Sequence, residues 1–234
     1  GEETFHELAG YYIERKPETL SGIRGVAFRD ENKGRDIVHT GWRELMDLSK
    51  VPFAYSNLTE FKNRIIYYES SRGCPFSCSY CLSSIDKKLR FRDIELVKKE
   101  LQFFIDNKVP QVKFVDRTFN CKHDHAMEIW RYITENDNGI TNFHFEISAD
   151  LLRAEELALM KTMRPGLIQL EIGVQSTNPQ TIKAIRRTMD FEKLKGIVEQ
   201  IHSFGNIHQH LDLIAGLPYE GYDSFHKSFC DVYA

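Results

Sequence analysis

The segment Ser71-Arg72-Gly73-Cys74-Pro75-Phe76-Ser77-Cys78-Ser79-Tyr80-Cys81 decides how the rest of the sequence is interpreted. It follows a short apolar run, Ile65–Glu69, and holds three of the five cysteines, Cys74, Cys78 and Cys81. Five cysteines are too few for a disulfide scaffold in a chain of 234 residues. Closely spaced thiols of this kind hold metal or perform redox chemistry more often than they form bridges.

Thiolate sulfur is a soft ligand that suits iron–sulfur clusters or zinc. Three thiolates on a four-iron cluster leave one iron without a protein ligand, and an open position of this kind distinguishes a catalytic metal from a structural one. A structural zinc ion would need a fourth ligand, for which Cys121, His123 and His125 are candidates. The three cysteines could also be inert or partly disulfide-bonded, so these alternatives stay open.

Apolar runs alternate with helical patterns from Arg64 onward. The expected strands are Ile65–Glu69, Gln111–Val115, Phe143–Ser148, Leu167–Val174 and His208–Ile214. The expected helices are Asp93–Asn107, His125–Glu135, Ala154–Met163, Pro179–Arg187, Phe191–Ser203 and one that starts near Asp223. This alternation predicts an α/β fold with a parallel sheet, whose strands are covered on both faces and read as near-continuous apolar runs. Ligands of such sheets bind beyond the carboxyl ends of the strands.

Residues 1–63 lack the regular alternation of strand and helix patterns that begins at Arg64. They predict a small α+β linker segment ahead of a core at 64–234. We expect a helix at Glu3–Arg15 and strands at Gly25–Phe28 and Ile37–His39. The chain starts at Gly1 and not at Met, and it stops inside an expected helix. We therefore expect a fragment of a longer protein.

The composition excludes several classes of protein. Lys and Arg total 31 against 34 Asp and Glu, which gives a net charge of −3 and argues against a dedicated nucleic-acid binder. Hydrophobic residues make up 41% and charged residues 28%, as in a soluble globular domain. No stretch approaches the roughly 20 apolar residues of a membrane span, and no signal peptide is visible. We expect a cytoplasmic protein without a membrane partner.

The cysteine segment resembles the signature of radical S-adenosylmethionine enzymes. The resemblance rests on Cys-x3-Cys-x2-Cys directly after a first strand, with the aromatic Tyr80 before the last cysteine, and it covers about 64–234. It implies a partial (β/α)6 TIM-like barrel with five strands present and the sixth beyond the end of the chain. It also implies that Cys74, Cys78 and Cys81 bind a [4Fe–4S] cluster. In this family the cluster reductively cleaves S-adenosylmethionine, and the 5′-deoxyadenosyl radical abstracts hydrogen from a substrate.

The resemblance extends to two further strand ends. Gly173-Val174-Gln175-Ser176 resembles a family element in which Gly173 permits close backbone approach and Gln175 bonds a ribose hydroxyl. Asp212-Leu213-Ile214-Ala215-Gly216-Leu217-Pro218 resembles an element of oxygen-independent coproporphyrinogen oxidases and of the cobalamin-dependent subgroup. It implies that Asp212 reaches the ribose from the other side. The alternative is a buried Asp that caps loop amides.

Four more cofactor contacts follow from the resemblance. The Tyr80 backbone is one, and an arginine that pairs with the methionine carboxylate is another; register favours Arg187 over Arg186. Ser148 stands where many members have a Glu. Asp116 could accept the methionine amine, or it could be the N-cap of the following helix.

The resemblance also suggests partners. Gly1-Glu2-Glu3-Thr4-Phe5 is similar to the end of a segment that follows a cobalamin-binding domain, so the subgroup implies cobalamin in the full-length protein. It further implies an electron donor such as flavodoxin or ferredoxin and a small-molecule or other unidentified substrate. The reaction could be hydrogen abstraction or methyl transfer. A structural zinc module and an electron-transfer iron–sulfur module without catalysis remain the alternatives.

We expect ordinary structural or solvated roles for the other polar clusters. We expect Cys121–His125 to be a loop that starts a helix, and Cys121 and Cys230 to be ordinary buried residues. His208 and His210 share one strand face and are expected to be structural. Lys87, Lys88, Arg90 and Arg92 predict a solvated basic patch, or else a surface for a redox partner or an anionic group.

Overall fold

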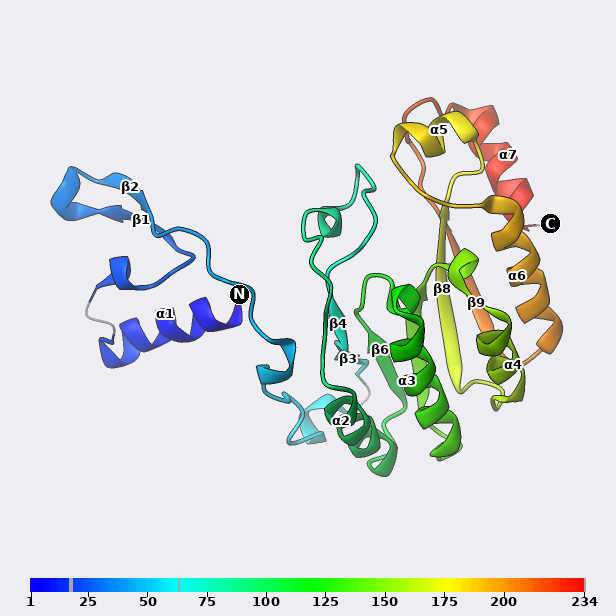
Figure 1. Cartoon of the computed structure of the whole chain (residues 1–234), viewed down its shortest axis with the longest axis horizontal. Coiled ribbons are helices and arrows are strands. Elements are labelled where there is room, and N and C mark those ends of the chain that lie inside the picture. Colours follow the sequence, from blue (N-terminus) through cyan, green and yellow to red (C-terminus); the bar gives the residue numbers. More distant parts are fainter. Residues whose placement is uncertain (17–18, 63, 234) are drawn as a thin grey trace. The chain divides into compact units, whose positions relative to one another are not determined.

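The computed structural model describes residues 1–16, 19–62 and 64–233 (Figure 1). The chain divides into two compact units, Gly1–Pro52 and Phe53–Ala234. Asn63 and Ala234, where the predicted linker and the predicted core end, lie outside the described residues.

The first unit contains the predicted helix and hairpin, with bounds shifted by a residue or two. Its elements are α1 (Glu2–Glu14), β1 (Ala27–Asp30) and β2 (Asp36–His39), and the two strands pair antiparallel. Arg43 forms ion pairs with Glu7 and, at 3.7 Å, with Glu3, which fastens α1 to the segment after β2.

The second unit is built on a five-stranded parallel sheet in the order β3-β6-β7-β8-β9. The strands are β3 (Ile66–Tyr68), β6 (Gln111–Phe114), β7 (Asn142–Ile147), β8 (Ile168–Gln175) and β9 (His208–Leu213). The helices are α2 (Ile94–Asp106), α3 (His123–Glu135), α4 (Ala154–Thr162), α5 (Pro179–Ala184), α6 (Phe191–Phe204) and α7 (Tyr222–Tyr233). The predicted α/β alternation with five parallel strands, consistent with a partial TIM-like barrel, is confirmed.

The second unit begins before the predicted boundary because its core extends upstream. Phe53, Tyr55 and Phe61 are partly buried and pack against the core of the sheet unit. The Phe53 ring lies 5.3 Å from the ring of Phe103 on α2. These aromatic contacts explain why the segment after Pro52 folds with the sheet.

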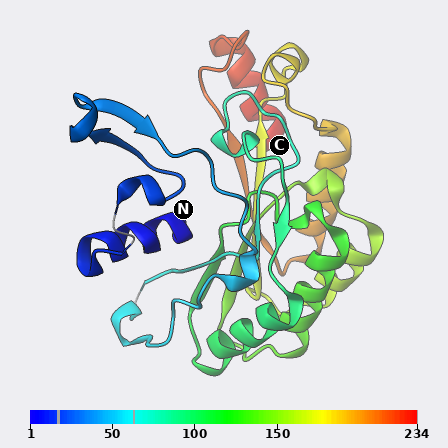
Figure 2. The ribbon, with the colours of Figure 1, turned by 60° about the vertical axis from the view of Figure 1, so that its left-hand side comes forward.

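The two faces of the sheet differ in chemistry, which corrects the expectation of strands buried on both sides. Residues of β8 alternate strictly between buried and partly exposed. Leu170, Ile172 and Val174 are fully buried on the face that the helices cover, and Figure 2 shows α3, α4 and α6 along one side of the sheet. Glu171 and Gln175 lie on the opposite, polar face. Alternation of this kind is typical of a sheet with one face on the core and one face toward a cavity.

The sequence did not predict a short antiparallel hairpin, β4 (Ser71–Arg72) with β5 (Arg90–Phe91), which brackets the cysteine segment. Arg92, directly after it, is buried, and its guanidinium pairs with both oxygens of the buried Glu100 on α2. The Tyr68 hydroxyl donates to the same carboxylate at 2.6 Å. This ion pair anchors the hairpin to the core.

The predicted solvated basic patch is therefore wrong in part. Arg92 is buried at the core, and Arg90 pairs with Asp86 within the hairpin loop. Lys87 binds the Phe76 carbonyl and the Ser77 hydroxyl inside the same loop. These cations hold the cysteine loop in shape.

None of the helices, over the residues that the structure describes, has the length and apolar character needed to cross a membrane.

Candidate functional site

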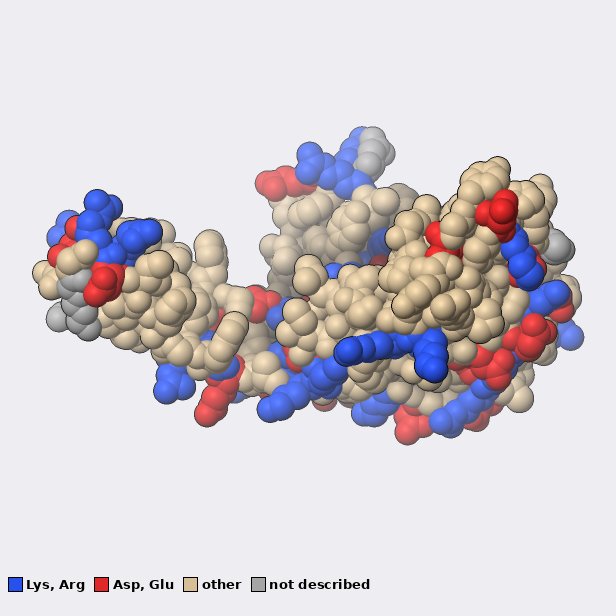
Figure 3. Space-filling view, turned by 90° about the horizontal axis from the view of Figure 1, so that it is seen from above, with Lys and Arg blue, Asp and Glu red and all other residues tan. Residues whose placement is uncertain are grey.

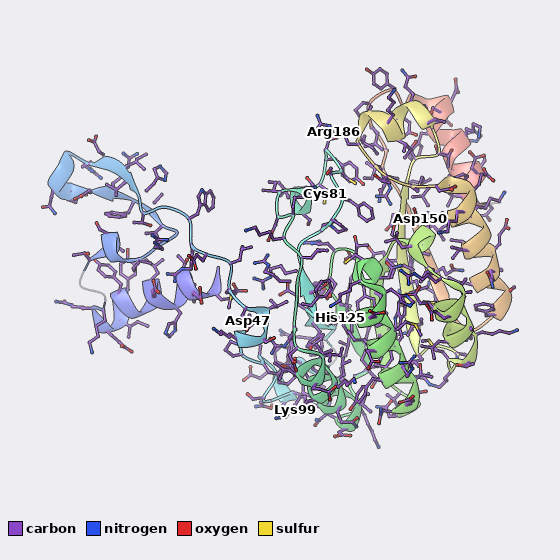
Figure 4. The ribbon with its side chains drawn as sticks, in the orientation of Figure 1. Asp47, Cys81, Lys99, His125, Asp150 and Arg186 are labelled. Atoms are coloured by element: carbon purple, nitrogen blue, oxygen red, sulfur yellow. The ribbon has the colours of Figure 1, made fainter. Side chains whose placement is uncertain are left out.

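A cavity of about 230 Å³ lies at the carboxyl ends of the strands, where the fold predicts a ligand site. All three cysteines of the loop line it, together with six of the seven predicted cofactor contacts, namely Tyr80, Ser148, Gly173, Gln175, Arg187 and Asp212. In Figure 4 the labelled Cys81, Asp150 and Arg186 lie toward this end of the sheet, and Lys99 lies toward the other.

Contacts within the chain define the shape of the cysteine loop. Gly73 has φ +101°, and a Cβ built on it would stand 2.7 Å from the Lys88 carbonyl oxygen, so only glycine fits there. The Cys74 amide donates to the Asp86 carbonyl at 3.2 Å, and the Ser79 amide donates to the Ile185 carbonyl at 2.9 Å. The loop is thus tied both to itself and to the end of α5.

The two histidines among the candidate fourth ligands of a zinc ion are engaged elsewhere. His123 Nε2 lies 2.7 Å from a Glu155 carboxylate oxygen. His125 Nε2 lies 3.1 Å from the Ser70 hydroxyl, and its ring packs against Phe91. Within residues 1–16, 19–62 and 64–233, no three His, Cys, Asp or Glu side chains converge as ligands of a single ion. The prediction that Cys121–His125 forms a loop and a helix start is confirmed, since α3 begins at His123.

Asp116 does not line the cavity, which corrects the expectation that it accepts the methionine amine. Its side chain is fully buried, and its carboxylate accepts hydrogen bonds from the Ser70 amide at 2.9 Å and from the Ser70 and Ser71 hydroxyls at 2.7 and 2.5 Å. It does not cap the following helix either, because the N-cap residue of α3 is Lys122. Asp116 instead fixes the strand that leads into the cysteine loop. Burial raises the pKa of Asp116 to about 6.

The end of β8 carries the predicted arginine site. The pairing of β8 with β9 is irregular between Gly173 and Gln175, and Gln175 has a left-handed φ of +73°. Strain of this kind is found preferentially at functional sites. The Arg187 guanidinium donates to the Gly173 carbonyl and, at 3.4 Å, to the Tyr80 hydroxyl. Its Nε is buried and has no hydrogen-bond partner among the described residues.

Arg187 and its neighbour Arg186 are placed differently. Arg187 lines the cavity, whereas Arg186 is exposed and has a left-handed φ of +54°. The buried, unpaired Nε of Arg187 needs an acceptor, and a carboxylate supplies two. The placement therefore favours Arg187 as the predicted carboxylate partner.

Ser148 and Asp212 complete the predicted set. The Ser148 backbone is held on both sides by the buried Asn120 amide, and its hydroxyl donates to Asp150 at 2.8 Å. Asp212 is exposed at the end of β9, and so it is not the buried loop cap of the alternative interpretation. Partial burial, and next the charge of Glu171, raise the pKa of Asp212.

The same cavity holds six polar side chains that the sequence did not assign to it, namely Ser83, Arg117, Thr118, Glu146, Glu171 and Thr188. The Thr118 hydroxyl lies 3.7 Å from the Cys74 sulfur. Glu146 and Glu171 stand directly opposite each other on neighbouring strands. The polar alternation His144, Glu146, Ser148 along β7 carried this signal, because residues two apart share a face.

The two remaining cysteines differ in their exposure. Cys230 is exposed on α7, so its predicted burial is wrong, and Cys121 is half-buried. Burial raises the pKa of the Cys121 thiol to about 11.

The His208 and His210 rings lie 4.4 Å apart, and His210 stacks on His144. All three belong to the polar face of the sheet.

The surface at this end carries charges of both signs. Figure 3 views it from above: Lys and Arg lie interspersed with Asp and Glu around Phe53–Ala234, and other residues cover most of its middle. A mixed surface differs from the basic stripe typical of nucleic-acid binders.

Two curated proteins are similar to almost the whole chain. An uncharacterised methyltransferase of Pyrococcus horikoshii is 24% identical over 94% of this chain and 48% of its own length. The cobalamin-dependent radical SAM methyltransferase TokK of Streptomyces tokunonensis is 26% identical over 96% of this chain and 35% of its own. The chain thus spans less than half the length of these relatives.

Solved structures share the fold. The cobalamin-bound OxsB structure, described as a cobalamin-dependent S-adenosylmethionine radical enzyme, superposes with a TM-score of 0.76 at 19% identity, covering 100% of this chain and 35% of the other. The radical S-adenosylmethionine methyltransferase TsrM of Kitasatospora setae gives a TM-score of 0.77 at 17% identity, covering 100% and 48%. Among protein families, the Radical SAM superfamily matches residues 68–229, which include the cysteine loop and every strand end of the cavity. The chain belongs to the Radical SAM superfamily.

Proposed function

We propose that this chain is the catalytic core of a radical S-adenosylmethionine methyltransferase. One observation carries the proposal: three thiols line the same cavity at the strand ends as an arginine whose buried Nε has no hydrogen-bond partner among the described residues. The thiols suit iron, and the arginine suits the carboxylate of an amino acid. Neither a structural zinc module nor an electron-transfer module accounts for the arginine.

The donor set fits a [4Fe–4S] cluster with one open iron. Cys74 and Cys78 are buried and Cys81 is half-buried, so a group held between them is shielded on the protein side and accessible from the cavity. Ligands of a cluster bind separate irons and need not converge on one point, unlike ligands of a single zinc ion. The supports of the loop, Gly73 and the Asp86 carbonyl, keep the three side chains in place.

When bound, the cluster supplies the electron that cleaves the carbon–sulfur bond of S-adenosylmethionine. The chain's own residues bind and orient that molecule. Arg187 offers Nε to the methionine carboxylate, while its contact with the Gly173 carbonyl fixes the guanidinium plane. Gln175 and Asp212, which line the cavity from neighbouring strands, would hydrogen-bond the ribose. The Tyr80 backbone and Ser148 line the remaining wall.

Methyl transfer with cobalamin in the full-length protein is the reaction that the relatives favour. Their similarity covers 94% and 96% of the chain, so it includes most of Gly1–Pro52 as well as the core. An electron donor such as flavodoxin or ferredoxin would reduce the cluster, and a small molecule would accept the methyl group.

Anaerobic reconstitution tests the core of this proposal. We expect about four iron and four sulfide per chain, and an absorption spectrum that changes when S-adenosylmethionine is added. Cys78→Ala should lose the cluster, whereas Cys230→Ala, on the exposed face of α7, should keep it. A colourless protein with stoichiometric zinc would overturn the proposal. Production of 5′-deoxyadenosine by the reduced chain, absent in Cys78→Ala, would support the catalytic step.

A further inference from the structure

Glu171, in the middle of β8, is a charged group that lines the cavity. It lies two residues before Gly173, or about 7 Å further from the strand end at the usual rise of a strand. The predicted contacts of S-adenosylmethionine on this strand, Gly173 and Gln175, lie nearer the end. Glu171 is therefore placed for a different ligand group.

The Glu171 carboxylate is held on one oxygen only. Lys113 Nζ on β6 lies 2.8 Å from Oε2, and His144 Nε2 on β7 lies 3.0 Å from the same oxygen. Both partners are well shielded from solvent, with side-chain exposures of 23% and 10%. Among the described residues, none makes a hydrogen bond or ion pair with Oε1. An acceptor fixed in this way is available to a ligand.

The surroundings give this acceptor a definite charge. Although burial alone would raise it, the hydrogen bond and charge of Lys113 and the charge of His144 hold the pKa of Glu171 below its usual value. Burial, and next the charge of Glu171, raise the pKa of Glu146, which stands directly opposite on β7. An ionised carboxylate beside a second carboxyl group attracts hydrogen-bond donors and repels anions.

We propose that Glu171 is a substrate-binding residue whose Oε1 accepts a hydrogen bond from an ammonium, hydroxyl or amide group of the methyl acceptor. The Lys113 hydrogen bond, with the His144 ring beside the same oxygen, holds the carboxylate, so little side-chain entropy is lost on binding. The same position rejects substrates that present a carboxylate or phosphate there. This inference rests on the proposed function, because it assigns a group of the second molecule in that cavity.

The variant Glu171→Gln inverts the hydrogen bonding of the site while preserving its shape. The amide oxygen must face the Lys113 ammonium, which leaves the amide NH2 in the place of Oε1. The site then donates where it formerly accepted. Glu128→Gln is the matched control, since Glu128 pairs with Lys98 at 2.9 Å on the surface of α3, outside the cavity.

Three probes of equal length test the class of ligand: n-butylamine, n-butanol and butyrate. Their binding to the full chain is followed by saturation-transfer NMR, with and without S-adenosylmethionine. We expect butylamine to bind the wild-type chain and the Glu128→Gln control, and to bind Glu171→Gln about tenfold more weakly, the loss expected for a charge-assisted hydrogen bond. Butanol should bind both the wild-type chain and Glu171→Gln, because a hydroxyl can donate or accept. We expect butyrate to bind only Glu171→Gln.

Each contrary result is decisive. Binding of butyrate to the wild-type chain, binding of none of the probes, or equal binding of the amine to Glu171→Gln overturns the inference. A tenfold loss of S-adenosylmethionine affinity in Glu171→Gln also overturns it, because Glu171 would then serve that molecule. If no S-adenosylmethionine binds the wild-type chain, the proposed function fails, while the probe results still decide whether Glu171 accepts donors. If Glu171→Gln does not fold, Glu171→Asp keeps the charge but withdraws the carboxylate by one methylene, and it should weaken amine binding in the same direction.

Discussion

Asp116 and His125 form a buried pair whose effects on stability oppose each other. Both contact the Ser70 hydroxyl, at 2.7 and 3.1 Å, beneath the strand that leads into the cysteine loop. Burial raises the pKa of Asp116 from 3.8 to about 6. Burial, and next the charge of Lys122, lower the pKa of His125 from 6.5 to about 4.

The sign of each effect follows from which state of the chain binds more protons. The folded chain holds the Asp116 proton more tightly, so the stabilising contribution of Asp116 is complete below pH 3.8 and is lost as the pH rises through about 6. The unfolded chain holds the His125 proton more tightly, so the contribution of His125 is complete above pH 6.5 and is lost as the pH falls through about 4. Each difference corresponds to about 3 kcal/mol.

Because the two windows overlap, the contributions nearly cancel in the wild-type chain. Asp116→Asn removes one of them. We expect the free energy of unfolding of Asp116→Asn to rise by about 2 to 3 kcal/mol relative to wild type between pH 4 and pH 7.5. His125→Gln should show the opposite trend, and the double variant should follow the wild-type profile.

Denaturant unfolding followed by tryptophan fluorescence measures these profiles. Trp130 is fully buried in α3, the helix that also carries His125, whereas Trp42 is 94% exposed and contributes a nearly constant signal. The comparison uses the change with pH, so any constant cost of the substitution drops out. A difference between Asp116→Asn and wild type that stays within about 1 kcal/mol over this range would refute the reasoning.

Three further predictions concern the cavity and its support. Arg187→Lys should weaken S-adenosylmethionine binding about tenfold in equilibrium dialysis, because an ammonium cannot replace the guanidinium fork. Arg186→Lys is the control and should leave the affinity unchanged. Gly173→Ala places a Cβ 2.3 Å from Gln175 Nε2, so it should displace that amide and reduce the same affinity with little change in the melting temperature; an unchanged affinity would contradict the placement of Gln175. Glu100→Gln removes the ionic partner of the buried Arg92. It should lower the free energy of unfolding of the second unit by about 3 kcal/mol in denaturant unfolding. A loss below about 1 kcal/mol would show that the ion pair is dispensable.

The sequence was sufficient for the order of elements and for most of the cavity. Apolar periodicity located all five strands of the sheet, since each buries at least one face. Motif register selected Gln175, Arg187 and Asp212, and the carboxyl ends of parallel strands bring such residues together.

The failures have a common physical cause. Asp116 follows β6 in the chain, but its partners Ser70 and Ser71 are 46 and 45 residues away, and local patterns do not reveal such contacts. The burial of Arg92 likewise depends on tertiary packing, because its partner Glu100, eight residues later, lies on the buried face of α2. A polar side chain on a strand can face either bulk solvent or an internal cavity, and the sequence alone does not distinguish the two. The residues around Glu171 come from three neighbouring strands, so only the folded structure brings them together.

The ties of the cysteine loop also have a consequence for assembly. The hairpin β4–β5, the Asp86 carbonyl and the Ile185 carbonyl restrain the loop through protein atoms alone. The chain entropy of the loop is therefore lost during folding. A group held by the three cysteines would then meet side chains that already lie close together, so its binding free energy would not be used to order the loop.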